Sequence, residues 1–158
     1  MAKNYFLSIF GNWKAYFAEF LGTFFFVLIS AGAIFNNSIN GDLGVLGIAT
    51  ASGIAYVALV FATIHLSGGH LNPVISFSVW FAGRMKALDL FFYVSVQMLA
   101  SLLAFWILAY IFGSVTDVSL SSKIISEGIS LQKAAIVEAI LAALLVFVYF
   151  ATMIDRRG

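Results

Sequence analysis

The stretch HLSGGHLNPV, residues 65–74, holds both histidines of this chain and its only proline. It interrupts a sequence that otherwise consists largely of long apolar runs. Proline is favoured at the first position of a helix, because its missing N–H would be unpaired there in any case. Asparagine is a preferred N-cap, since its side-chain oxygen accepts an N–H of the first turn. The order Asn72–Pro73 therefore predicts that an irregular segment ends here and a helix begins.

The predicted helix, PVISFSVWFA at residues 73–82, is short. Gly83 provides a stop, and Arg84 and Lys86 add the positive charge that stabilises a helix C-terminus. Ten residues at about 1.5 Å each extend about 15 Å, half of a hydrocarbon core of about 30 Å. The segment cannot span a membrane, so it is either a surface helix or a re-entrant half-helix.

The composition indicates that a lipid bilayer is the natural solvent of this chain. Of its 158 residues, 63% are hydrophobic and only 9% are charged, whereas soluble domains carry about 25% charged residues. The absence of cysteine excludes disulfides, thiolate metal sites and thiol catalysis. A net charge of +1 gives no indication of nucleic-acid binding.

Four segments have the roughly 20 largely apolar residues that a transmembrane helix needs. They cover residues 15–35, 43–66, 89–112 and 131–154. If the N-terminus is cytoplasmic and the short helix is re-entrant, six basic residues lie inside and two outside, as the positive-inside rule favours. The inner set is Lys3, Lys14, Arg84, Lys86, Arg156 and Arg157, and the outer set is Lys123 and Lys133. We therefore predict a multi-pass cell-membrane protein with a cytoplasmic N-terminus.

The first and fourth predicted helices resemble each other. KAYFAEFLGTFFFVLI at 14–29 and KAAIVEAILAALLVFV at 133–148 share a lysine, an alanine, a glutamate and a valine at a constant offset of 119 residues. Because three spanning segments begin before the second copy starts, the two copies run in opposite directions across the membrane. This is the pattern of an inverted repeat, with which transport proteins build a site at the bilayer midplane.

The polar residues inside these apolar segments indicate how the site works. Irregular backbone at membrane depth persists only where it is buried in protein or lines a water-filled cavity. A glycine-rich strand of carbonyls at residues 67–71, followed by an amide and a positive helix end, suits small hydrogen-bonding solutes and opposes cations. The alternative is a plain kinked loop before a cytoplasmic surface helix.

Carboxylates within a membrane helix normally face the protein interior and have a partner. Glu19 and Glu138 are expected either to accept N–H groups of the irregular loop or to relay protons. Gln97 is expected to brace the same loop or to join two helices. A metal site built on the two histidines is disfavoured because they are five residues apart across a glycine turn. A serine protease built on Ser67 and His70 has only a weak motif in its favour.

AEFLGT at 18–23, SGGHLNPV at 67–74, Gln97 and the glutamate-bearing fourth helix resemble the major intrinsic proteins, the aquaporin and aquaglyceroporin family. The loop signature of that family is Ser-Gly-x-His-x-Asn-Pro-Ala. The resemblance implies six spanning helices and two half-helices that meet at the midplane, with one pore in each protomer of a homotetramer. It also implies passive conduction of water or small neutral solutes such as glycerol, with no cofactor, no metal and no enzymatic activity.

The resemblance implies a role for each motif residue. In the loop, the carbonyls of Gly69, His70 and Leu71 would line the pore, Asn72 would donate to the solute, and Pro73 and Val74 would complete the motif. Glu19 and Glu138 would hold the two loops, and Gln97 would support them. His65 would lie at the cytoplasmic mouth, and Ser52 would lie in the selectivity constriction. Water-selective members usually carry phenylalanine at the last position and glycerol facilitators tryptophan. A serine there suggests a wider and more polar opening.

This sequence departs from the family pattern in two respects. Val74 stands where the signature has alanine, and the second half-helix, its Asn-Pro pair and the constriction arginine are not in the sequence. We therefore expect an all-α, aquaporin-like inverted-repeat bundle of four transmembrane helices and one re-entrant half-helix, truncated after the fourth helix. Residues 1–112 would form the first repeat, 113–130 an extracellular loop and 131–158 the start of an incomplete second repeat. The alternative is a non-conducting membrane remnant, or a subunit that needs a partner to complete a pore.

Overall fold

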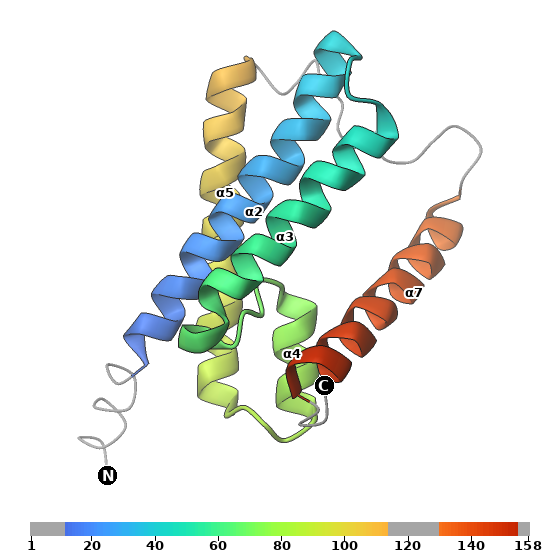
Figure 1. Cartoon of the computed structure of the whole chain (residues 1–158). Coiled ribbons are helices and arrows are strands. Elements are labelled where there is room, and N and C mark those ends of the chain that lie inside the picture. The colour runs from blue at the N-terminus through green and yellow to red at the C-terminus, as the bar shows by residue number, and fades with distance from the viewer. Residues whose placement is uncertain (1–11, 114–129, 155–158) are drawn as a thin grey trace. The chain divides into compact units, whose positions relative to one another are not determined.

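The computed structural model describes residues 12–113 and 130–154 (Figure 1). The chain forms two compact units, Met1–Gly113 and Ser114–Gly158. The first contains α2 (Trp13–Asn40), α3 (Gly44–Ser67), α4 (Pro73–Phe81) and α5 (Ala87–Phe112), and the second contains α7 (Leu131–Tyr149) followed by the π-helical segment η1 (Phe150–Ile154). Every regular element within these residues is helical, and the all-α prediction is confirmed.

Within the described residues, four helices are long and apolar enough to cross a membrane: Trp13–Asn40, Gly44–Ser67, Ala87–Phe112 and Leu131–Met153. Large apolar side chains such as Leu46, Phe61 and Leu102 are exposed along them. A surface of this kind is costly in water and favourable in lipid. The chain is thus a multi-pass membrane protein. The predicted loop 113–130, apart from its two end residues, and the basic residues Lys3, Lys123, Arg156 and Arg157 lie outside the described residues.

The first helix is longer than the sequence pattern predicts, because it continues from residue 35 to Asn40. Its polar end is stabilised within the helix: Asn40 Nδ2 donates to Asn36 Oδ1 at 2.8 Å, and Ser38 Oγ donates to the carbonyl of Phe35 at 2.8 Å. Gly41 then adopts a left-handed conformation (φ 74°) and ends the helix. The apolar stretch therefore ends near residue 35, whereas the helix continues to Asn40.

The first unit is built around α2, which packs against both α3 and α5 (Figure 1). Small buried residues, among them Ala18 and Gly22 on α2 and Ala100 and Ala104 on α5, let the backbones approach closely. Near the start of α5, the hydroxyl of Tyr16 donates to Asp89 Oδ1 at 2.7 Å. These contacts form the frame in which the interrupted segment is held.

Helix α4 is the short helix predicted after Asn72, and it ends one residue earlier than expected, at Phe81. It packs against α5 (Figure 1). After its last residue, the N–H of Gly83 donates to the carbonyl of Trp80 at 2.9 Å, and Gly83 has a positive φ of 70°. Nine residues extend only about 14 Å, so α4 is too short to span a bilayer.

Candidate functional site

The carboxylate of Glu19 lies at the centre of the first unit and accepts four hydrogen bonds. Oε1 accepts from Ser67 Oγ at 2.6 Å and from the N–H of His70 at 2.9 Å. Oε2 accepts from the N–H of Leu71 at 2.7 Å and from Gln97 Nε2 at 2.8 Å. The side chain of Glu19 is 0% exposed. One buried carboxylate on α2 therefore ties together the end of α3, the irregular segment and the middle of α5.

A second set of polar contacts surrounds this carboxylate. Gln97 Nε2 also donates to Ser76 Oγ at 3.1 Å, and Ser76 Oγ is 3.0 Å from Nδ1 of His70. The hydroxyl of Tyr93 donates to the carbonyl of Ser67 at 2.8 Å. Ser76 and Gln97 are 0% exposed, so these hydrogen bonds form away from water, where each is costly to lose. The network fixes the irregular segment to both α4 and α5.

The irregular segment itself, residues 68–72, has an unusual backbone. Gly68, Gly69 and Leu71 have positive φ angles of 89°, 63° and 49°. Such angles cost a non-glycine residue about 1–2 kcal/mol. Leu71 is stabilised there by the bond from its N–H to Glu19, and its side chain fills the space in front of Gly22, where a Cβ would collide with it. At Gly69 a Cβ would come within 3.1 Å of the carbonyl oxygen of Val60, so a side chain would disturb the packing of the loop on α3.

Asn72 caps the short helix. Its Oδ1 accepts from the N–H of Val74 at 2.8 Å, and Pro73 occupies the first helical position. Because the oxygen is engaged in the cap, the amide NH₂ group is the part of Asn72 that can donate to a solute. The helix N-terminus behind it carries a partial positive charge. The arrangement combines a hydrogen-bond donor with the partial positive charge of a helix N-terminus.

The structure brings only some of the predicted site residues together. Glu19, His70, Leu71 and Gln97 belong to the buried network, with Asn72 at its edge. Four others lie elsewhere or at the surface: Ser52 is half-buried on α3, His65 is exposed in the last turn of α3, Val74 is 41% exposed, and Glu138 is exposed on α7 in the second unit.

Two residues of the network were not predicted from the sequence. Tyr93 is one of many aromatic residues in an apolar helix, and nothing in its spacing marks it. Ser76 has a weak signal, because it lies one helical turn after Asn72 and its hydroxyl also approaches the carbonyl of Asn72 at 3.3 Å. The contacts of Ser67 and His70 disfavour a protease, since the Ser67 hydroxyl donates a hydrogen bond to the carboxylate of Glu19 and His70 Nδ1 contacts Ser76.

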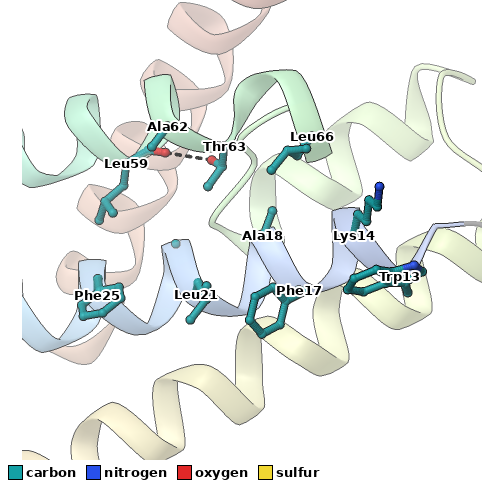
Figure 2. Close-up of a pocket in the computed structure, with 11 residues that line it drawn as sticks. Trp13, Lys14, Phe17, Ala18, Leu21, Phe25, Leu59, Ala62, Thr63 and Leu66 are labelled. Atoms are coloured by element: carbon teal, nitrogen blue, oxygen red, sulfur yellow. Dashed lines mark hydrogen bonds between the residues drawn. The ribbon is translucent and has the colours of Figure 1, made fainter.

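An apolar groove of about 450 Å³ runs along the seam between α2 and α3 (Figure 2). Its walls include Phe17, Leu21 and Leu66, with Lys14 near one end. The hydroxyl of Thr63 within it donates to the carbonyl of Leu59 at 2.8 Å. Because its lining offers so few hydrogen-bonding groups, this groove is not suited to the passage of polar solutes.

Comparisons with known proteins identify the family of this chain. The family model described as "Major intrinsic protein" matches residues 7–158. The chain is 34% identical over 146 residues to the lens fiber major intrinsic protein of Canis lupus familiaris. These aligned residues cover 92% of this chain and 55% of the relative. It is 32% identical over 151 residues to the probable aquaporin TIP5-1 of Arabidopsis thaliana, with 92% of this chain and 58% of the relative covered.

A third relative gives the same result. The lens fiber major intrinsic protein of Lithobates pipiens is 32% identical over 149 residues, which cover 94% of this chain and 56% of the relative. The chain thus spans a little over half the length of the curated relatives it matches. The family match extends over both units and includes the loop before α4. This chain belongs to the major intrinsic protein family.

Proposed function

We propose that this chain forms part of a passive transmembrane channel for water and small neutral solutes such as glycerol. The observation that carries the proposal is the non-helical segment 68–72, which is fixed by the buried carboxylate of Glu19 and ends in a capped helix N-terminus.

The depth follows from the helix to which the loop is bound. Gln97 lies ten residues after Ala87, the first residue of α5, or about 15 Å along the helix axis. A hydrocarbon core is about 30 Å thick. If α5 spans that core, the contact between Gln97 and Glu19 lies near the bilayer centre. Helix α4 would then be a re-entrant half-helix whose N-terminus is near the centre, and not a surface helix.

At such a depth, irregular backbone requires either burial in protein or a water-filled path beside it. The N–H groups of His70 and Leu71 are engaged by Glu19. We assign the carbonyls of Gly69, His70 and Leu71 as acceptors for a passing solute and the Asn72 amide as its donor. The partial positive charge at the start of α4 would disfavour cations and protons. Water and small hydroxylated molecules, which both donate and accept, suit this combination.

The remaining assignments follow from the family pattern. We assign Ser52 to the selectivity constriction, where a small residue favours solutes wider than water, and His65 to the cytoplasmic mouth. Glu138 would support a second loop as Glu19 supports the first. We also assign residues 1–112 to the first repeat and residues 131–158 to the start of the second. A cytoplasmic N-terminus, the cell membrane and a homotetramer belong to the same proposal.

The test is solute permeability. The protein is reconstituted into proteoliposomes, and stopped-flow light scattering follows volume changes after an osmotic step with sucrose or glycerol. Permeability to water or glycerol above that of protein-free vesicles, with a low activation energy, would support the proposal. Permeability equal to that of protein-free vesicles for both solutes would contradict it and favour the alternative, a non-conducting membrane subunit.

A further inference from the structure

The groove of about 450 Å³ between α2 and α3 is apolar along its length and carries a charge at one end (Figure 2). Among the described residues that line it, only Lys14 is charged, and none is acidic. The hydroxyl of Thr63 donates to the carbonyl of Leu59 within its own helix. An occupant of the groove therefore meets apolar surface along the two helices and a single positive charge at the end.

The groove is also elongated. It follows α2 from Trp13 to Phe25, which at about 1.5 Å per residue are about 18 Å apart along the helix axis. Figure 2 shows Trp13 and Lys14 at one end and Phe25 at the other. Ala62, which is exposed on α3, contributes only a methyl group to the wall and leaves room between the helices. A long, narrow and apolar space of this kind suits a chain of methylene groups.

The charged end has the composition of a membrane interface. Trp13 is the first residue of α2 and is 55% exposed, and Lys14 beside it is also exposed. The ammonium group of Lys14 lies 6.0 Å from the centroid of the Trp13 ring. Tryptophan is enriched at the level of the lipid headgroups, and a lysine near a helix end extends its ammonium to the same level. The groove thus begins where headgroups lie and continues among acyl chains.

We propose that the groove between α2 and α3 binds an anionic phospholipid, with one acyl chain along the groove and the headgroup phosphate on Lys14. The ammonium donates charge-assisted hydrogen bonds to the phosphate oxygens. The groove is accessible to lipid, because the long apolar helices of this chain expose apolar side chains. A zwitterionic phospholipid has its own cation beside the phosphate, so Lys14 makes the site selective for a negative headgroup. The site requires only the membrane location of the chain and does not depend on conduction.

The test compares two lipids with identical acyl chains. The purified protein in detergent is titrated with phosphatidylglycerol or phosphatidylcholine, and native mass spectrometry gives the affinity for the first lipid bound. We expect phosphatidylglycerol to bind about fivefold more tightly, the factor for one lysine near an anionic lipid. Lys14→Gln should remove this preference and Lys14→Arg should retain it. Lys133→Gln is the matched control, because it removes an exposed lysine at the start of α7 in the other unit and should leave the preference unchanged.

A second variant tests the groove itself. Ala62→Phe fills the groove, whereas Ala49→Phe adds the same ring at an exposed position of α3 outside it. Ala62→Phe should weaken the binding of both lipids, and Ala49→Phe should weaken neither. Equal affinities of the wild-type protein for the two lipids, or a preference that persists in Lys14→Gln, would overturn the inference. Dimers that Ala62→Phe abolishes while lipid binding is unchanged would also overturn it, because the groove would then bind a second copy of the chain.

Discussion

Replacing Glu19 with glutamine tests how the irregular loop is held. The substitution changes one carboxylate oxygen into an amide NH₂ and leaves the size of the side chain nearly the same. Each oxygen of Glu19 accepts two hydrogen bonds, and one of each pair comes from a backbone N–H, that of His70 or that of Leu71. An NH₂ group cannot accept a hydrogen bond. Whichever way the amide turns, one backbone N–H loses its acceptor.

The structure allows the size of the effect to be worked out. Leaving a buried donor unsatisfied costs about 1–3 kcal/mol. The remaining bonds also lose the charge assistance that makes such bonds about twice as strong as neutral ones. We therefore expect the free energy of opening residues 68–72 to decrease by at least about 2 kcal/mol. This corresponds to an increase of about 30-fold in the open population.

Amide hydrogen exchange, measured by mass spectrometry on the protein in lipid nanodiscs, reports this opening directly. The amides of His70 and Leu71 should exchange about 30-fold faster in Glu19→Gln. Glu138→Gln is the matched control, because it removes an exposed carboxylate from α7 in the other unit. Exchange of both amides within a factor of about two of the wild-type rate would refute the role assigned to Glu19.

Three further substitutions test the other parts of the site. Gly22→Val introduces a side chain into space occupied by Leu71. It should destabilise the first unit by about 1–3 kcal/mol and lower the thermal unfolding midpoint. An unchanged midpoint would contradict the packing of Leu71 against Gly22. Asn72→Asp keeps the acceptor for the N–H of Val74 but loses the amide donor and adds a charge. The protein should therefore fold normally, while its solute permeability falls about tenfold or more. Permeability equal to that of the wild-type protein would contradict the role assigned to Asn72. Ser52→Phe should reduce glycerol permeability more than water permeability, and undiminished glycerol uptake would contradict its assignment to the constriction.

Much of the local structure around the loop could be predicted from the sequence, because local chemistry determines it. The order Asn72–Pro73 predicts a helix start, and Gly83 predicts its end to within one residue. The four long helices follow from hydropathy, since backbone groups in lipid must pair within their own segment.

The side-chain network could be predicted only in part. Glu19 and the glycine-rich loop can be paired from the sequence, because a buried N–H and a buried carboxylate each need a partner. The contributions of Tyr93 and Ser76 depend on how α4 and α5 pack, which no local pattern encodes. The length of α2 beyond residue 35 depends on hydrogen bonds among its own polar residues, which hydropathy does not register.

The central claim is that the N-terminus of α4 lies near the bilayer centre, and its depth can be measured. The chain contains no cysteine, so Val74→Cys, at a position 41% exposed, introduces a unique thiol for a nitroxide spin label. Power saturation with oxygen and a water-soluble nickel complex gives the depth of the label in vesicles, and Lys86→Cys, just before α5, serves as the interfacial reference. We predict that the label at position 74 lies about 15 Å deeper than the label at position 86. Equal depths at the interface would show that α4 is a surface helix and would contradict the account.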